Sequence, residues 1–184
     1  MKRIILSGGG TGGHIYPAVA VAEALKHKYG NEVEILFVGA EGKMEMEKVP
    51  ALGYNIVGLP IAGLQRRLEP KNLLVPFKTV SSVWKARSII KDFSADAVVG
   101  FGGYASAPVL FAAQMLGVPT IIQEQNSYAG LTNKMLSRRA RRICVAYEGM
   151  ERFFPADKII LTGNPLRGRF APAKAKSEEA LAYY

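Results

Sequence analysis

The chain has 184 residues, of which 24 are Lys or Arg and 15 are Asp or Glu, so its formal net charge is +9. This length buries a real core in one or at most two domains, and 49% hydrophobic with 21% charged residues is typical of a globular protein. No run of about 18 apolar residues exists, which excludes a membrane-spanning helix, and the apolar start is too short for a signal peptide. The single cysteine, Cys144, excludes an internal disulfide, fits the cytosol and is interpreted as a small core residue.

The positive charge indicates an acidic partner, which can be nucleic acid, anionic lipid or a phosphorylated substrate. One basic cluster lies at 138–142, and a second consists of Lys71, Lys78 and Lys85, whose spacing of seven puts them on one side of a helix. No aromatic residues are interleaved with these clusters, and no known nucleic-acid motif accompanies them. Nucleic acid is therefore the weaker option.

The first predicted unit is a strand, a glycine loop and a helix. The apolar run Ile4-Ile5-Leu6 is followed by Ser7-Gly8-Gly9-Gly10-Thr11-Gly12-Gly13-His14. From Ile15 to Leu25 apolar residues recur at helical spacing, and Pro17 is expected in the first turn. Such a unit presents backbone N–H groups and a positive helix end to an anion, and glycine places no Cβ between a ligand and the backbone.

The loop satisfies G-x-G-x-x-G at Gly8, Gly10 and Gly13, which alone is a weak indication of a dinucleotide site. The acidic residue that would hold a ribose belongs near the end of the second strand, and Glu41 comes slightly late for this role. His14 stands where a P-loop has lysine, which excludes that motif. A tight turn that simply needs glycine is the structural alternative, but a histidine at a helix start facing a crevice favours a functional site.

Strand-like and helix-like segments alternate along the rest of the chain. The predicted strands are 33–38, 55–58, 97–99, 118–122, 142–146 and 159–161. The predicted helices are 44–52, 73–92 and 131–140, with another that opens at Ser106 as its N-cap and has Pro108 in its first turn. In helix 73–92 the expected core stripe is Leu73, Phe77, Val80 and Trp84. This alternation predicts an α/β fold with one parallel, doubly wound, Rossmann-like sheet.

Ligands of such sheets bind beyond the carboxyl ends of the strands, at the point where the strand order reverses. The loops that start at Ser7, Gly100, Gln123 and Gly163 all leave carboxyl ends. We therefore expect these four loops to share one rim.

Three loops carry a resemblance to a known family. Gly9 to His14 reads G-G-T-G-G-H, Gly102 to Ser106 reads G-G-Y-x-S, and Glu124 to Asn126 reads E-Q-N, followed by Gly130-Leu131-Thr132-Asn133 and Gly163-Asn164-Pro165. Over essentially the whole chain this combination resembles the amino-terminal half of the MurG family, bacterial transferases that add N-acetylglucosamine to lipid I in peptidoglycan synthesis. That family usually reads H-E-Q-N, whereas this chain has Gln123 in place of the histidine.

The resemblance implies half of the two-domain glycosyltransferase fold called GT-B, inverting chemistry, no metal and no cofactor. It implies UDP-N-acetylglucosamine as donor and undecaprenyl-diphosphate-linked lipid I as acceptor, at the cytoplasmic face of the bacterial inner membrane. Residues 1–170 would form the acceptor-binding domain. Residues 171–184 would lead, through the start of a helix, to a missing carboxyl-terminal domain that holds most of the donor, so the chain alone is expected to be inactive.

The resemblance also assigns individual residues. The donor contacts on this half are Thr11, Gly12, Gly13, Asn126 and Arg167. The acceptor contacts are Gly9, Gly10, Gly102, Gly103, Tyr104, Ser106 and Asn133. His14 and Glu124 are the catalytic candidates, because an imidazole suits a base near neutral pH and a carboxylate either acts as that base or orients a sugar hydroxyl. The alternatives are that local N–H groups satisfy Glu124 and that Tyr104 packs on its loop.

A helix face with Lys71, Lys78 and Lys85, flanked by Leu74 and Val75, predicts peripheral binding to an anionic membrane, with an ordinary solvated face as the alternative. Two other functions are weighed against the transferase. A membrane-docking subunit of a split glycosyltransferase would be favoured by an amino-terminal anchor, and the sequence shows no such segment. A nucleotide-dependent oxidoreductase rests on the first glycine loop alone and explains neither the second loop nor 124–126.

Overall fold

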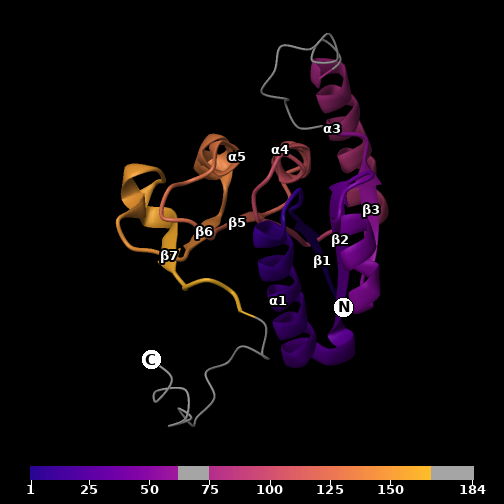
Figure 1. The fold of residues 1–184 in the computed structure, drawn as a ribbon, viewed down its shortest axis with the longest axis horizontal. Coiled ribbons are helices and arrows are strands. Elements are labelled where there is room, and N and C mark those ends of the chain that lie inside the picture. The colour runs from indigo at the N-terminus through magenta and orange to yellow at the C-terminus, as the bar shows by residue number, and fades with distance from the viewer. Residues whose placement is uncertain (62–74, 167–184) are drawn as a thin grey trace, which may run out of the picture.

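A computed structural model describes residues 1–61 and 75–166, which form a seven-stranded parallel sheet flanked by helices (Figure 1). The strands are β1 (Lys2–Ser7), β2 (Val33–Ala40), β3 (Asn55–Leu59), β4 (Ala97–Gly100), β5 (Thr120–Glu124), β6 (Arg142–Val145) and β7 (Ile159–Leu161). The α-helices are α1 (Gly12–Tyr29), α2 (Glu45–Lys48), α3 (Val75–Asp92), α4 (Ser106–Met115) and α5 (Leu131–Leu136). Short 3-10 turns are η1 (Gly30–Glu32), η2 (Pro50–Leu52), η4 (Ser137–Arg139), η5 (Met150–Arg152) and η6 (Ala156–Lys158).

The strand order is β3-β2-β1-β4-β5-β6-β7, and each neighbouring pair is parallel. The order reverses between β1 and β4, where Ser7 lies opposite Gly100. This reversal is the switch point at which doubly wound sheets bind their ligands. The predicted Rossmann-like sheet is confirmed, and the two glycine loops leave it from neighbouring strands.

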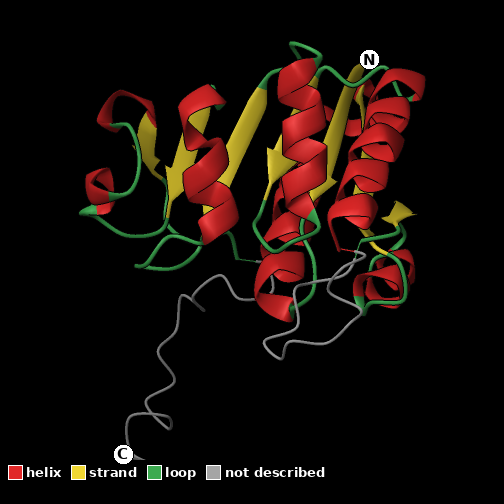
Figure 2. Ribbon diagram, turned by 90° about the horizontal axis from the view of Figure 1, so that it is seen from above, coloured by secondary structure: helices red, strands yellow, loops and turns green. Residues whose placement is uncertain are grey.

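The core lies on both faces of the sheet because successive strand residues point to opposite sides. Ile5 belongs to the larger cluster, which packs against α3 and α4, whereas Leu6 belongs to the cluster under α1. Val98 and Val99 on β4 divide in the same way. In Figure 1 α4 and α5 lie above the row of strands and α1 lies below it, and Figure 2 shows helices in front of the strands.

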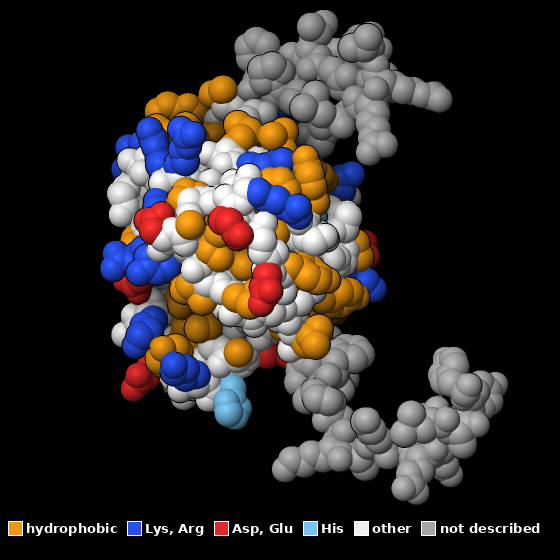
Figure 3. Space-filling view, turned by 90° about the vertical axis from the view of Figure 1, so that its left-hand side faces the viewer, with side chains coloured by type: hydrophobic (Ala, Val, Ile, Leu, Met, Phe, Trp, Pro, Cys, Tyr) orange, Lys and Arg blue, Asp and Glu red, His pale blue; other side chains and the backbone are white. Residues whose placement is uncertain are grey.

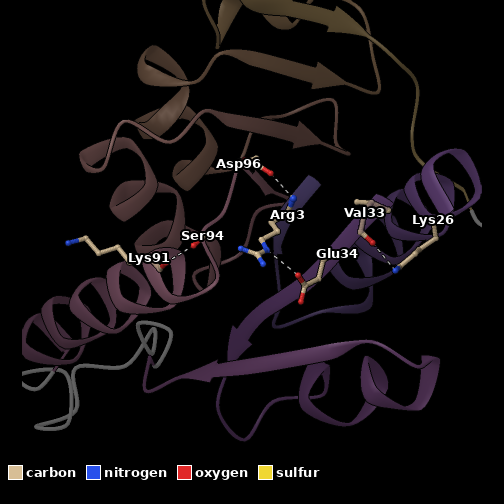
Figure 4. Close-up of polar contacts among 7 residues, drawn as sticks. All are labelled: Arg3, Lys26, Val33, Glu34, Lys91, Ser94 and Asp96. Carbon is tan, nitrogen blue, oxygen red and sulfur yellow. Dashed lines mark hydrogen bonds and ion pairs between the residues drawn. The ribbon is translucent and has the colours of Figure 1, made fainter. Parts of the chain in front are cut away.

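Polar contacts join β1 to its neighbours, and α1 to β2, at the edge of the sheet where the strands begin (Figure 4). The Arg3 backbone N–H donates to the Asp96 carboxylate at 2.7 Å, and the Arg3 guanidinium pairs with Glu34 at 3.2 Å. The Lys26 ammonium donates to the Val33 carbonyl at 2.9 Å. The Arg3–Glu34 pair is largely exposed and contributes little to stability.

The boundaries of two predicted helices are corrected by the structure. Helix α1 already begins at Gly12, so Pro17 lies in its second turn and not in the first. Helix α4 has Ala105 as its N-cap, so the prediction for Ser106 is wrong. The Ser106 hydroxyl instead donates to the Gly103 carbonyl at 3.0 Å, which ties the start of α4 to the glycine loop before it.

The predicted core stripe of α3 is wrong at both positions whose side chains the structure describes. Val80 is 57% exposed and Trp84 is 67% exposed, whereas Ser82, Ala86 and Ile90 are buried. Helix α3 packs on α4, and its buried side includes the small side chains at 82 and 86. The two other members of the stripe, Leu73 and Phe77, lie outside the described side chains.

Cys144 lies on β6 and is half-buried, in keeping with a packing role. Burial raises the pKa of its thiol above the ordinary value of 9.0. The thiol therefore stays protonated near neutral pH, where a protonated thiol is a poor nucleophile.

Gly100 tests the packing of β4 against α4. A Cβ at this position would lie 2.4 Å from Leu110 Cδ1, so we expect Gly100→Ala to lower the free energy of unfolding by about 1–3 kcal/mol through overpacking. Urea unfolding of the 184-residue chain measures this change. Gly13→Ala is the matched control, because its Cβ would have only an ordinary contact at 3.7 Å. Equal stability of the two variants would contradict the packing of Leu110 on β4.

Candidate active site

Three neighbouring strands deliver the motif residues to one rim. β1, β4 and β5 are adjacent and parallel, so their carboxyl ends lie together. The fourth segment, which follows β7, also reaches this rim. Asn164, Pro165 and Leu166 line a hollow of about 580 Å³ together with Gly12 and Tyr16 at the start of α1. The expectation that the four loops share one rim is confirmed.

The first glycine loop is shaped by contacts that exclude side chains. Gly10 has φ +85, and a Cβ there would lie 3.1 Å from the ring of Tyr104. A Cβ at Gly9 would lie 2.1 Å from an oxygen of Glu45. The Gly10 N–H donates to the other oxygen of Glu45 at 3.1 Å. Contrary to the sequence-based expectation, this N–H therefore points inward and is unavailable to a ligand.

The second glycine loop contacts the first directly. Gly102 has φ +89 and Gly103 has φ +77, conformations that favour glycine. A Cβ at Gly103 would lie 2.4 Å from the Gly9 carbonyl oxygen, and one at Gly102 would lie 3.1 Å from His14 Nε2. The two loops therefore meet backbone to backbone, with the imidazole of His14 against the second loop.

His14 is partly buried in the first turn of α1, and its ring is held through one nitrogen. Nδ1 lies 3.2 Å from the Gly9 carbonyl oxygen and 3.1 Å from Thr11 Oγ1. A carbonyl oxygen only accepts hydrogen bonds, so the contact with Gly9 is a hydrogen bond in the tautomer that carries its proton on Nδ1, whereas the Thr11 hydroxyl can accept from or donate to the same nitrogen. In the Nδ1–H tautomer Nε2 is unprotonated, and this nitrogen faces Gly102.

Glu124, at the end of β5, is 1% exposed and accepts four N–H groups. One oxygen accepts the Asn126 backbone N–H at 3.1 Å and the Asn126 amide at 3.0 Å. The other accepts the Gly130 N–H at 2.9 Å and the Asn133 amide at 2.9 Å. This carboxylate fastens the loop after β5 to the sheet, and its hydrogen bonds match the alternative of local satisfaction.

Asn133 and Asn126 differ in exposure although both donate to Glu124. Asn133 is 1% exposed, and its amide nitrogen lies 3.6 Å from the place of a Cβ at Gly102, on which His14 also converges. Its Oδ1 is buried without a hydrogen-bond partner among the described residues. Asn126 is exposed at the rim and open to a ligand.

Tyr104 lies over Gly10 and is partly buried. Burial, with a smaller contribution from the charge of Glu45, raises the pKa of its phenol above 10.0. The phenol therefore remains a neutral hydrogen-bond donor across the neutral range. The packing alternative for Tyr104 and a contact with a ligand are compatible in this position.

Gln123, the departure from the family pattern, points into the protein. Its side chain is 2% exposed and accepts a hydrogen bond from Gln125 Nε2, which also donates to the Phe101 carbonyl at 3.0 Å. The Gln123 Nε2 has no partner among the described residues. Gln125 therefore joins the segments that follow β4 and β5, and Gln123 accepts a hydrogen bond from the same amide group.

The predicted membrane-facing residues are only partly described. Lys78 is exposed, and Lys85 pairs with Glu41 at 2.8 Å. Glu41 is also the acidic residue that a dinucleotide site would have used to hold a ribose, and its carboxylate is already paired with Lys85. Arg167, Lys71 and Leu74 lie outside the described residues, as does the side chain of Val75.

Glu45 belongs to none of the sequence motifs, but it lies on α2 and contacts the glycine loop 35 positions earlier in the chain. The sequence around Glu45 or Gly10 does not predict this contact. Glu45 lies just after β2 and Gly10 just after β1, so only the pairing of β1 with β2 brings the two residues together.

Comparison with known proteins gives a consistent result. Residues 4–145 match the glycosyltransferase family 28 N-terminal domain. Over 179 residues the chain is 59% identical to the UDP-N-acetylglucosamine–N-acetylmuramyl-(pentapeptide) pyrophosphoryl-undecaprenol N-acetylglucosamine transferase of Bacteroides fragilis, and 62% identical to that of Phocaeicola vulgatus. Each alignment covers 97% of the chain and 47% of the relative, so the chain spans about half the length of the curated relatives it matches.

Solved structures agree with the fold. The crystal structure of Acinetobacter baumannii MurG aligns with a TM-score of 0.77 at 34% identity, over 89% of this chain and 46% of that one. A UDP-GlcNAc 2-epimerase from Neisseria meningitidis aligns with a TM-score of 0.64 at 16% identity, over 90% of this chain and 47% of that one. The second likeness is one of fold alone.

The anchoring role of Glu124 is testable by stability. Glu124→Ala leaves the N–H groups of Gly130 and Asn133 without their acceptor, and we expect the free energy of unfolding to fall by about 3 kcal/mol. Urea unfolding of the chain measures the loss. Glu148→Ala, at an exposed glutamate, is the control and should change stability by no more than about 0.5 kcal/mol. A loss as small as the control's would show that Glu124 does not anchor the loop.

Proposed function

Because the chain belongs to glycosyltransferase family 28, as its N-terminal domain, we propose that it is the acceptor-binding half of an inverting N-acetylglucosamine transferase. The donor is UDP-N-acetylglucosamine, and the acceptor is lipid I, the undecaprenyl-diphosphate-linked sugar that becomes lipid II in peptidoglycan synthesis. The relatives that the chain matches at 59% and 62% identity carry this activity in their names. The proposed reaction uses neither a metal nor a cofactor.

The observation that carries the proposal is the convergence of His14 on the two glycine loops at the switch point. Nε2 of His14 is directed to Gly102, while Asn133 approaches the same glycine from the loop after β5. This arrangement offers one acceptor of a proton beside a surface of backbone and amide groups. Such a surface suits the hydroxyl and amide groups of an amino sugar.

In the proposed reaction a hydroxyl oxygen of the acceptor sugar attacks the anomeric carbon of the donor. The new carbon–oxygen bond forms on the face opposite the departing UDP, the bond to UDP breaks, and the configuration inverts once. The hydroxyl proton passes to Nε2 of His14, and the Gly9 carbonyl, which accepts the Nδ1–H, stabilises the imidazolium that results.

The departing diphosphate would lie at the start of α1. This helix has 18 residues and no acidic side chain in its first turn, so the positive end of its dipole is not neutralised there. The N–H groups of Gly12 and Gly13 in that turn, together with the exposed side chains of Thr11 and Asn126, are the proposed donor contacts. Arg167 is proposed as a further donor contact on the resemblance alone.

Of the two roles open to Glu124, we propose orientation of the acceptor site and not that of base. All four of its hydrogen bonds come from N–H groups that an ionised carboxylate accepts, and its side chain is buried. Through these bonds it holds Asn126 and Asn133 in place. Gly9, Gly102, Gly103 and Tyr104 keep their proposed role as acceptor contacts. Gly10, whose N–H donates to Glu45, and Ser106, which is 0% exposed and donates to the Gly103 carbonyl, are proposed to shape the acceptor site without touching the ligand through these groups.

We further propose that this half binds the cytoplasmic face of the inner membrane as a peripheral protein, through the face of α3, α4 and α5. A groove of about 450 Å³ runs between these helices. Exposed apolar side chains line it: Val80, Trp84, Phe111, Met115 and Met135. Among the described residues no helix is long and apolar enough to span a bilayer.

This face carries the proposal better than the lysine stripe that the sequence predicts, because Lys85 is already paired with Glu41. Arg87 lines the groove and Lys78 is exposed on the same helix, so positive charge accompanies the apolar surface. Figure 3 views the molecule from its β7 side, which is a different face, and shows Lys and Arg side chains there among apolar ones. Apolar contact combined with positive charge suits an anionic bilayer.

Histidine replacement tests the proposed base. In the complete protein, His14→Ala should lower kcat by about 10²–10⁴-fold, because the attacking hydroxyl loses its proton acceptor, while the unfolding midpoint changes little. Steady-state transfer of labelled N-acetylglucosamine to a lipid I analogue measures this. His27→Ala, at the exposed histidine of α1, is the control and should keep wild-type turnover. Turnover of His14→Ala within a few-fold of wild type would return His14 to a structural role.

Liposome sedimentation tests the membrane face. The chain should bind vesicles that contain anionic lipid, and binding should decline as salt rises. The double variant Trp84→Glu, Met135→Glu should lose most of this binding, since it places charge where apolar side chains would enter the headgroup region. Tyr147→Glu, at an exposed aromatic residue outside the groove, is the control. Wild-type binding by the double variant would exclude this face.

A further inference from the structure

Glu45 is a fully buried carboxylate that belongs to none of the motifs. It lies on α2, just after β2, and its side chain is 0% exposed. One oxygen accepts the Ala40 N–H at 3.0 Å and the other accepts the Gly10 N–H at 3.1 Å. No ion pair found among the described residues includes it. Burial of a carboxylate with backbone partners alone is costly, so its presence needs an explanation.

Two glycines from different segments make room for this side chain. A Cβ at Gly9 would lie 2.1 Å from Glu45 Oε1, and a Cβ at Gly39 would lie 2.6 Å from Glu45 Cγ. Neither position has the positive φ that would by itself favour glycine. The slot between the first loop and the end of β2 therefore fits the carboxylate and excludes side chains from both neighbouring segments.

The hydrogen bond from Gly10 to Glu45 determines the orientation of one peptide group. The Gly10 N–H and the Gly9 C=O belong to the same planar trans peptide, so they point in opposite directions. With the N–H turned to Glu45, the carbonyl is turned to His14 Nδ1, at 3.2 Å. Glycine tolerates either orientation of this peptide, so the backbone alone does not choose between them.

We propose that Glu45 is a positioning residue that sets the tautomer of His14 through the Gly9–Gly10 peptide. With Glu45 in place, the Gly9 carbonyl accepts the Nδ1 proton and leaves Nε2 free to receive the proton of the acceptor hydroxyl. If the peptide turned over, the Gly10 N–H would point to Nδ1 and favour the form with its proton on Nε2, which cannot act as the base. The catalytic part of this inference rests on the proposed function, and the tautomer itself does not.

Imidazole nitrogen NMR of the 184-residue chain tests the tautomer directly. The chain has only two histidines, so His27 serves as an internal reference. In alkaline buffer, where an imidazole is neutral, wild-type His14 should be mainly in the Nδ1–H form. Glu45→Met keeps an unbranched side chain of similar length but removes the acceptor, and it should raise the Nε2–H fraction of His14 severalfold without changing His27. Glu47→Met, at the exposed glutamate of the same helix, should leave both histidines unchanged.

A measurement on the wild-type chain covers the case in which Glu45→Met does not fold. The Gly10 amide should exchange its hydrogen much more slowly than that of the exposed Gly42, because the Gly10 N–H is bound to a buried carboxylate. An unchanged His14 tautomer in folded Glu45→Met, or Gly10 exchange as fast as that of Gly42, would overturn the proposal.

Kinetics of the complete protein separate this inference from the proposed function. Glu45→Met should lower kcat by about 10- to 100-fold with little change in KM, and it should lower it no further in a His14→Ala background, because both changes remove the same base. An equal additional loss in that background would mean that Glu45 acts through general stability and would reject the inference. Full turnover of His14→Ala would instead reject the proposed base, and the NMR result for the tautomer would stand by itself.

Discussion

The close contact between two backbone segments at the switch point is the constraint on which the candidate site depends. The Gly9 carbonyl oxygen lies so close to Gly103 that a side chain at position 103 would collide with it. Gly10 lies under the ring of Tyr104. This contact is possible only because β1 and β4 are neighbours in the sheet, so that both loops leave from the same place. The imidazole of His14 can therefore pack directly against the backbone of Gly102, which has no side chain to keep it away.

Two buried carboxylates stabilise this arrangement from below. Glu45 holds the first glycine loop, and Glu124 holds the loop after β5, each through N–H groups alone. Because an unpaired buried charge is expensive, every one of these hydrogen bonds resists displacement. The groups proposed to face the ligand are thereby held in position by the fold itself, which is the condition for electrostatic stabilisation of a transition state.

Helix α4 connects the candidate site with the proposed membrane face. Its first residue, Ser106, is bonded to the second glycine loop, and Pro108 and Phe111 farther along line the groove beside α3 and α5. A lipid-linked acceptor has a polar sugar-diphosphate part and an apolar chain. One helix therefore places a polar rim and an apolar groove within the same domain, in the combination that such an acceptor requires.

Local sequence determined the elements and much of the rim. Apolar runs identified the strands, glycine clusters identified the two loops, and alternation identified the doubly wound sheet, because these features depend on periodicity and on glycine, both of which are visible in short windows. His14 was singled out by its position at the end of the first glycine loop, whereas Tyr104 and Asn133 were assigned by the family resemblance of their motifs. Their catalytic and binding roles remain proposals.

Tertiary structure decided what depends on partners far along the chain. Local pattern could not determine which side of α3 is buried, because the helix has apolar residues on more than one side and the small residues Ser82 and Ala86 lie on the side that is buried. Nor could it show that Glu45 receives the Gly10 N–H, which depends on the pairing of β1 with β2 and on the empty space at Gly9. A periodic pattern shows which residues of one element share a face. Which other element packs against that face is decided only by the order of the strands in the folded sheet.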